Sequence, residues 1–181
     1  MPGLSDVYFV SSNNHKFQEV YSILDELDIT VKHYAATLPE IQSASLYDIA
    51  THKAAHAYTL LKSPVIVEDA GLFIDSLKGF PGPYSSFVYD TIGNQGILNL
   101  VKVERGATFR SIVAYSDGSV SKCFSGELRG AISTRIVGTK WGYDPIFMPD
   151  GSHDTLAHID KVSLSHRRLS LESFAAWFVS K

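Results

Sequence analysis

The spacing of apolar residues in the first third of the chain predicts two strand–helix pairs. A short apolar run at residues 7–10 is typical of a strand, and apolar side chains then recur at helical spacing. These positions are Phe17, Val20, Tyr21, Leu24 and Leu27. Residues 29–34 alternate between apolar and polar side chains, which predicts a second strand. A second helical stripe follows at Ile49, Ala50, Ala54, Ala57, Tyr58 and Leu61.

The third predicted strand carries the most informative polar residues. Three β-branched residues at positions 65–67 are typical of a strand that is buried on both faces, and Glu68 and Asp69 follow at its expected end. Ala70 is small enough for a ligand to approach the backbone. Ionised carboxylates in such a place are costly unless a positive group meets them, either a divalent cation, a lysine or both. The alternative is that Asp69 only caps the next segment.

The second half of the chain has an antiparallel pattern. Residues 79–86 form a stiff turn with two prolines and two glycines, and we expect helices at residues 85–92 and 95–101. A strand at residues 109–115, an Asp-Gly turn and a return strand at residues 120–128 then predict a hairpin. A last helix has its apolar stripe at Leu171, Phe174, Ala175 and Phe178.

These elements predict an α/β fold with a central mixed, twisted sheet and helices on both sides. We expect a single domain over residues 1–181, since the sequence contains no repeat, low-complexity tract or linker. We expect it to have two lobes, with the active-site cleft between them at the carboxyl ends of the first strands.

Composition narrows the class of protein. The chain has 181 residues, of which 45% are hydrophobic and 19% charged, and this is ordinary for a globular protein. A net charge of −3 gives no sign of a nucleic-acid partner. One cysteine excludes an intrachain disulfide. No apolar run approaches the ~20 residues that span a bilayer, and the N-terminus lacks a signal pattern. We therefore expect a cytoplasmic protein without membrane contacts.

Two segments have the residue types of an anion site. The polar turn at residues 11–16 lies between a strand and a helix and places Lys16 at the helix start, which is an anion-binding geometry. It lacks the phosphate-loop pattern G-x-x-x-x-G-K-[ST]. Ser45 and Asp48 have the spacing of a capping box for the second helix. Lys53 borders the alanine-rich stripe of that helix, so it either extends along the surface or points into a cleft.

The most aromatic loop, residues 138–147, suggests a nucleobase site. Its glycines surround Trp141, Tyr143 and Asp144, which would form a flat platform beside a hydrogen-bond acceptor. The alternative is a packed aromatic turn. His166 and Arg167 would project from the first turn of the last helix, where cations oppose the helix dipole, and this favours a functional role.

Six short motifs in this order resemble the inosine triphosphate pyrophosphatase (Ham1-like) family. They span residues 11–16 (T-G-N-x-x-K in the family), 39–42 (P-E-x-Q), 68–72 (E-D-[ST]-G-L), 80–85 (F-P-G-x-Y-S), 141–147 (the G-[FW]-G-[YW]-D-P-x-F segment) and 165–167 (S-H-R). Here Ser12 replaces the usual glycine, and Ala70 replaces a common serine or threonine.

This resemblance implies hydrolysis of a nucleoside triphosphate between its α- and β-phosphates, giving a monophosphate and pyrophosphate. The implied substrates are ITP, dITP and XTP, and the implied assembly is a homodimer. Mg²⁺ would be held by Glu40 and Asp69, with Glu68 nearby, and Asp69 would orient or deprotonate the attacking water. The alternative function is a nucleotide-binding regulatory module that is catalytically silent. A Nudix-type pyrophosphohydrolase is disfavoured because its acid-rich helix motif is missing.

The remaining residues would bind substrate. Four cations would offset the roughly four negative charges of the triphosphate: Lys16, Lys53, Lys161 and Arg167. Trp141 and Tyr143 would stack on the base, while Asp144, His166 and Arg167 would read its edges. The complete predicted substrate-binding set is Ser11, Ser12, Asn13, Asn14, His15, Lys16, Lys53, Ala70, Ser86, Trp141, Gly142, Tyr143, Asp144, Lys161, His166 and Arg167.

Overall fold

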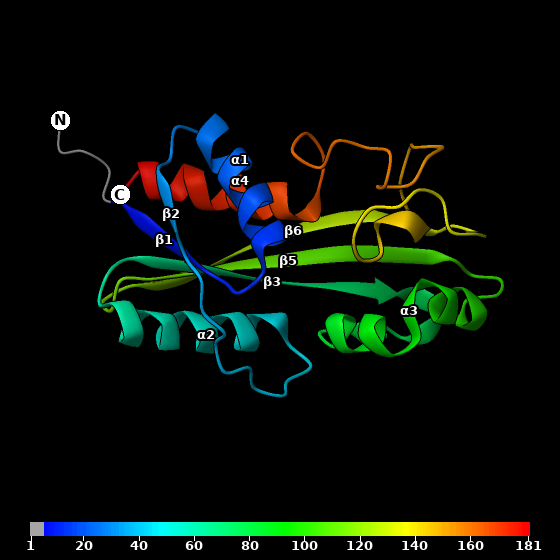
Figure 1. The fold of residues 1–181 in the computed structure, drawn as a ribbon, viewed down its shortest axis with the longest axis horizontal. Helices are drawn as coiled ribbons and strands as arrows, with labels where there is room; N and C mark the ends of the chain where they lie inside the picture. Colours follow the sequence, from blue (N-terminus) through cyan, green and yellow to red (C-terminus); the bar gives the residue numbers. More distant parts are fainter. Residues whose placement is uncertain (1–5) are drawn as a thin grey trace. The chain divides into compact units, whose positions relative to one another are not determined.

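The computed structural model describes residues 6–181, in which seven β-strands form one sheet (Figure 1). Its strand order is β2-β1-β3-β5-β6-β7, and β4 pairs with β3. The strands are β1 (Val7–Val10), β2 (Val31–Tyr34), β3 (Val65–Ile74), β4 (Pro81–Gly82), β5 (Gly106–Ser116), β6 (Ser121–Ile132) and β7 (Phe147–Pro149). β1 lies parallel to β2 and β3, whereas β4 and β7 lie antiparallel to their partners β3 and β6. The predicted mixed sheet is confirmed.

The chain divides into two compact units. Unit 1 contains the described residues up to Asp69 together with Ser111–Gly126 and Arg167–Lys181, and unit 2 contains Ala70–Arg110 and Glu127–His166. Strands β3, β5 and β6 each supply residues to both units. Two lobes were predicted, and two units are found. The predicted cleft between them stays a prediction.

Four α-helices flank the sheet. They are α1 (Asn14–Glu26), α2 (Leu46–Leu61), α3 (Ser85–Leu100) and α4 (His166–Val179), and the short 3₁₀ helices are η1 (Asp75–Leu77) and η2 (Asp144–Ile146). In unit 1, α1 and α4 cover one face of the sheet and α2 covers the other (Figure 1). Most of the predicted stripe of α2 is buried, with no exposed surface on Ala50, Ala54 and Ala57, whereas Tyr58 and Leu61 are half-buried. Because alanine ends at Cβ, this face lets the helix approach the sheet closely.

Strand β3 continues through Glu68 and Asp69, so the prediction that it ends at these carboxylates is wrong. The alternative, in which Asp69 caps a following segment, is wrong for the same reason. The residues after Asp69 pair with β4, and this pairing extends the strand. A Cβ on Gly71 would overlap the carbonyl of Gly82, so only glycine allows β4 to approach this closely.

Unit 2 has its own core. The core residues are Leu72, Ile74, Val88, Ile97, Val101, Ala107, Phe109, Leu128, Ile132, Tyr143, Ile146, Phe147 and Leu156. The two helices predicted at residues 85–92 and 95–101 occur as two segments of α3, separated at Gly93, whose φ of 60° and ψ of −168° are not helical. The predicted hairpin is also confirmed, because β5 and β6 are neighbours joined by a turn in which the Asp117 amide donates to the Val120 carbonyl at 3.2 Å.

The helix starts follow their predicted caps in part. The Ser45 hydroxyl accepts from the Asp48 amide at 3.3 Å, as in a capping box. The return contact differs, because the Asp48 carboxylate accepts from the Ser43 hydroxyl at 3.1 Å, and that hydroxyl accepts from the Ser45 amide at 3.1 Å. Within residues 6–181, no helix combines the length and apolar character needed to cross a membrane.

Candidate active site

The polar turn between β1 and α1 has the predicted strand–turn–helix geometry. The Ser11 amide donates to the Tyr34 carbonyl at 3.2 Å, which continues the β1–β2 pairing. The Ser11 hydroxyl accepts from the Asn13 amide, and the Asn13 side chain accepts from the Lys16 amide, both at 3.1 Å. Ser12 is absent from the described residues with left-handed backbone, so this turn does not need the family's glycine there.

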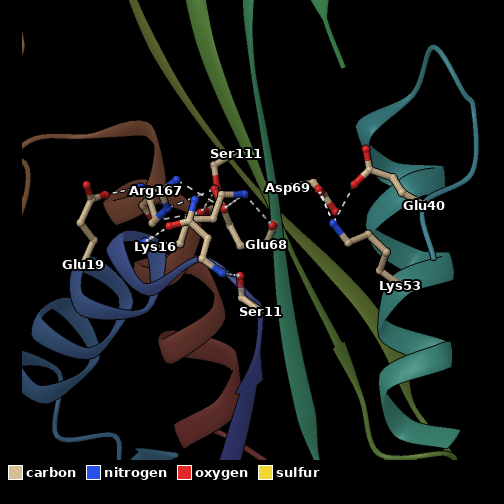
Figure 2. Close-up of polar contacts among 11 residues, drawn as sticks. Ser11, Lys16, Glu19, Glu40, Lys53, Glu68, Asp69, Ser111 and Arg167 are labelled. Carbon is tan, nitrogen blue, oxygen red and sulfur yellow. Dashed lines mark hydrogen bonds and ion pairs between the residues drawn. The ribbon is translucent and has the colours of Figure 1, made fainter. Parts of the chain in front are cut away.

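Lys16 projects from the first turn of α1 onto Glu68 of β3 (Figure 2). Its ammonium lies 3.0 Å from a Glu68 carboxylate oxygen and donates to the Glu68 carbonyl at 3.1 Å. The Glu68 side chain has 0% of its surface exposed, and the Ser111 hydroxyl donates to it at 2.7 Å. Ser111 in turn shares a hydrogen bond with Ser170 at 2.9 Å. Glu68 is therefore a buried carboxylate whose charge is met by nearby donors.

Arg167, at the start of α4, completes this cluster. Its Nε lies 3.2 Å from a Glu68 oxygen, and another guanidinium nitrogen pairs with Glu19 of α1 (Figure 2). Although burial disfavours its charged form, the carboxylates of Glu68 and Glu19 raise the pKa of Arg167 above its ordinary value. We conclude that the buried guanidinium of Arg167, the half-buried ammonium of Lys16 and two carboxylates lie together on one face of β3.

Asp69 points to the opposite face of β3 from Glu68, as adjacent residues of a strand do. There the Lys53 ammonium of α2 donates to Asp69 at 2.8 Å and to Glu40 at 3.0 Å (Figure 2). Lys53 therefore points inward to these carboxylates, and the alternative of a lysine that extends along the surface is wrong. The predicted trio of acidic ligands is thus split, with Glu40 and Asp69 on one side and Glu68 on the other.

The residues around Asp69 fit a magnesium ion. Asp69 Oδ2 is buried and has no hydrogen-bond partner within the described part of the chain. Mg²⁺ prefers such hard oxygen ligands and is commonly bound through one or two carboxylates together with substrate phosphates. Across residues 6–181, no group of three or more His, Cys, Asp or Glu side chains is placed to hold a metal. The fit therefore rests on Asp69 and Glu40 together with substrate oxygens.

The two partners at this position have shifted pKa values. Burial raises the pKa of Asp69 above its ordinary value, and the attraction of Lys16 and Lys53 offsets only part of this effect. Burial also disfavours the ammonium of Lys53, but the Asp69 and Glu40 carboxylates outweigh it and raise the pKa of Lys53. A carboxylate with a raised pKa is a better proton acceptor, which suits a group that activates water.

Of the predicted base-binding residues, Trp141, Tyr143, Asp144 and His166 lie in unit 2, as does the predicted phosphate contact Lys161, whereas Arg167 lies in unit 1. Lys161 pairs with Asp144 at 3.1 Å, and both side chains are buried. Trp141 has 46% of its surface exposed. Tyr143 is buried. Its hydroxyl donates to the Ser85 carbonyl at 2.8 Å, and its ring contacts that of Tyr89 edge to face, with the ring centroids 5.4 Å apart. Tyr143 therefore matches the alternative of a packed aromatic turn, whereas Trp141 offers an exposed face.

Comparisons with known proteins show the family of this chain. A model of the Ham1 family matches residues 7–177. This chain belongs to the Ham1 family. It is 45% identical to the dITP/XTP pyrophosphatase of Methanopyrus kandleri, in an alignment that covers 95% of both chains. It is 42% identical to the dITP/XTP pyrophosphatase of Pyrococcus horikoshii, in an alignment that covers 94% of this chain and 95% of the relative. A HAM1 protein from Coxiella burnetii has a similar structure, with a TM-score of 0.84, 26% identity and coverage of 98% and 100% of the two chains.

The structure adds partners that the Ham1-family motifs do not include. Glu19 and Ser111 both contact the Glu68–Arg167 cluster. Glu19 lies three residues after Lys16, so it shares a face of α1 with that lysine, and this spacing is visible in the sequence. Ser111 lies within the apolar run of β5, where nothing in the sequence points to Glu68.

The contacts of the remaining predicted substrate-binding residues do not indicate a role in the site. Ser86 is exposed, whereas its neighbour Ser85 is buried and its hydroxyl accepts from the Leu72 amide at 2.8 Å. His166 is buried and stacks on Phe109, with ring centroids 4.6 Å apart. Ser12, Asn14 and His15 are exposed at the polar turn, Ala70 is half-buried in β3, and Gly142 has a φ of 69°. The predicted contacts of these residues with substrate stay predictions.

Proposed function

We propose that this protein hydrolyses non-standard purine nucleoside triphosphates, namely ITP, dITP and XTP, to the monophosphate and pyrophosphate. The names of its relatives, dITP/XTP pyrophosphatases at 38–45% identity, support this substrate class. The observation that carries the proposal is the buried Asp69 Oδ2, which lacks a hydrogen-bond partner in the described residues and lies beside Lys53 and Glu40. This is a water-activating and metal-binding group next to a phosphate-binding cation.

Lys16 and Lys53 are the proposed phosphate contacts of unit 1. Each ammonium is already within hydrogen-bond distance of a carboxylate, so each is held in a fixed position before substrate arrives. A lysine acts on phosphate as a compact charge, so neither contact needs the planar geometry of an arginine. Phosphate oxygens would share these ammonium groups with Glu68 and Asp69.

We propose Mg²⁺ as the cofactor, with Asp69 and Glu40 as its protein ligands. The ion would supply charge stabilisation for the phosphate oxygens during cleavage. Asp69 would orient the attacking water and accept its proton, for which its raised pKa is suited. Glu68 keeps Lys16 and Arg167 in place on the other face of β3. We therefore propose Glu68 as a positioning residue and not as the metal ligand that the sequence suggested.

Base selection is assigned to unit 2. A 6-oxopurine presents an N1–H donor beside the O6 acceptor, whereas adenine presents an N1 acceptor beside an amino group. Asp144 is an acceptor and Lys161 a donor, and they lie 3.1 Å apart. This pair matches the 6-oxopurine edge and leaves polar groups unpaired against adenine, which penalises binding. The roles of His166 and Arg167 at the base stay proposals.

Product analysis tests the function directly. Purified protein is incubated with dITP and Mg²⁺, and nucleotides and phosphates are separated by ion-exchange chromatography. We expect equal amounts of dIMP and pyrophosphate, with little product from ATP. Release of orthophosphate with dIDP would contradict cleavage between the α- and β-phosphates. Tight binding of dITP without any product would instead support the regulatory module.

Assembly, domain count and compartment follow only from the family resemblance and the sequence. We propose a homodimer, one functional domain that comprises both units, and a cytoplasmic location. Light scattering of the purified protein tests the dimer, since the mass of one chain is 19.9 kDa.

A further inference from the structure

His33 of β2 contacts the polar turn at residues 11–16, although His33 belongs to none of the six family motifs. Its Nε2 lies 2.9 Å from the Ser11 carbonyl oxygen. Its ring stacks on that of Phe17, the residue after Lys16, with centroids 4.1 Å apart and an angle of 9° between the planes. The half-buried imidazole therefore meets both ends of the turn, through a hydrogen bond at its start and a stacked ring at its end.

The hydrogen bond to Ser11 is the first of a connected series. The Ser11 hydroxyl accepts from the Asn13 amide, the Asn13 side chain accepts from the Lys16 amide, and the Lys16 ammonium reaches Glu68. A shift of the Ser11 peptide would therefore change the position of the cap of α1 and of the Lys16 backbone. These are the groups that we assign to the phosphates.

Strand pairing explains why His33 is in reach. β1 and β2 are parallel, with Phe9 opposite His33 and Val10 opposite Tyr34. Ser11 is the first residue beyond β1, and its amide donates to the Tyr34 carbonyl. The imidazole supplies a donor to the Ser11 carbonyl. Because a carbonyl oxygen only accepts, the imidazole donates from Nε2 in this contact.

We propose that His33 is a positioning residue for the phosphate-binding turn of this enzyme. It holds the Ser11 peptide through the Nε2–H donor, and thereby orients the turn and Lys16 for the triphosphate. This inference rests on the proposed function, because it assigns His33 to the binding of that substrate. His33 is not a catalytic residue, since its described contacts are to the turn and to Phe17.

Two matched pairs of variants separate the hydrogen bond from the packing. His33→Phe keeps an aromatic ring for Phe17 but removes the donor. His33→Gln removes the ring but keeps an N–H donor. The side-chain nitrogen of glutamine is separated from Cα by as many bonds as the imidazole Nε2. His33→Asn is polar like the glutamine but one bond shorter, so its amide does not reach Ser11. His153→Phe is the control for an imidazole replaced on an exposed position of unit 2.

The measurements are steady-state kinetics with dITP and calorimetric binding of tripolyphosphate. We expect His33→Phe and His33→Asn to raise KM for dITP by about 3- to 10-fold, with kcat nearly unchanged. This factor corresponds to the net contribution of one hydrogen bond. Tripolyphosphate binding should weaken by the same factor, and inosine binding should not change. His33→Gln should recover most of the loss, and His153→Phe should match the natural protein.

Several outcomes would overturn the proposal. One is an equal rise of KM for dITP in His33→Gln and His33→Asn, which would assign the effect to the loss of the ring. Another is a KM in His33→Asn that equals that of the natural protein. A fall in kcat alone would place His33 in the chemical step instead. If the natural protein releases no pyrophosphate from dITP, the proposed function fails, while tripolyphosphate binding by the same variants still decides the role of His33.

Discussion

Two adjacent carboxylates in β3 differ in how many charged and polar groups meet their oxygens. Glu68 is fully buried, but Lys16, Arg167 and Ser111 meet its oxygens. Asp69 has one close ammonium, from Lys53, and one buried oxygen without a hydrogen-bond partner in residues 6–181. The alternation of a strand produces this difference, because it sends neighbouring side chains to different faces. We infer that Glu68 organises the site and that Asp69 performs the chemistry.

The first prediction tests the chemical role of Asp69. Asp69→Asn keeps the size of the side chain but removes the carboxylate that accepts a proton. We expect turnover of dITP to fall by at least ~100-fold, a typical size for the loss of one general base. Pyrophosphate release at saturating Mg²⁺ measures the effect. Turnover close to that of the natural protein would rule out this role.

The second prediction concerns pH. Because burial raises the pKa of Asp69, this carboxylate takes up a proton at a higher pH than an ordinary aspartate does. A protonated Asp69 is a poor metal ligand, so the apparent affinity for Mg²⁺ should fall as the pH is lowered from neutral to mildly acidic. Titrations of activity with Mg²⁺ across this range measure the trend. An affinity for Mg²⁺ that is constant or rises on acidification would contradict the assignment.

The third prediction tests the structural role of Glu68. Glu68→Gln removes the buried counter-charge of Lys16 and leaves Arg167 with Glu19 alone. Removing one partner of a buried ion pair costs about 3–5 kcal/mol. Denaturant unfolding gives this as a loss of unfolding free energy. Glu40→Gln is the matched control, because the Glu40 side chain is about half exposed and its pair with Lys53 should contribute less than about 1 kcal/mol. Equal losses in both variants would contradict the distinction.

At the scale of elements, periodicity predicted the long segments and missed the short ones. The stripe of α4 was visible because apolar spacing persists over several turns, and the stiff turn at residues 79–86 indicated where α3 begins. The extension of β3 was missed, since Ala70 and Gly71 have low strand propensity and only their pairing with β4 makes them a strand. β4 and β7 contain two and three residues, too few for a periodic pattern.

The fourth prediction concerns this β3–β4 contact. Gly71→Ala adds a Cβ that would overlap the Gly82 carbonyl, so β4 must move away from β3. We expect a loss of unfolding free energy of about 1–3 kcal/mol, the usual cost of overpacking. Thermal or denaturant unfolding measures it. Ala70→Ser is the control at the neighbouring, half-buried position, and a larger loss in this control than in Gly71→Ala would refute the explanation.

At the scale of the whole molecule, the sequence proposed candidate residues for the site but not the contacts that they make. Arg167 was predicted to contact the base, yet it pairs with Glu19, 148 residues away in the sequence. Ser111 donates to Glu68 across 43 residues. Both contacts arise from the packing of α1, α4 and β5 around β3 in unit 1, and no local pattern encodes such pairs. The candidate residues could be proposed from the sequence because each motif is local.

The last prediction concerns the choice of base, which we assign to Asp144 and Lys161 of unit 2. In Asp144→Asn, the amide oxygen would face the Lys161 ammonium and its NH₂ group would face the base. This presents a donor to N1, which suits adenine and opposes a 6-oxopurine. We expect the ratio of kcat/KM for ITP over ATP to narrow by roughly 10- to 150-fold, the value of one contact to a charged group. Trp141→Ala is the comparison, since its exposed ring can stack on any base and should weaken both substrates by similar factors. A ratio that narrows in Trp141→Ala and persists in Asp144→Asn would show that stacking selects the base.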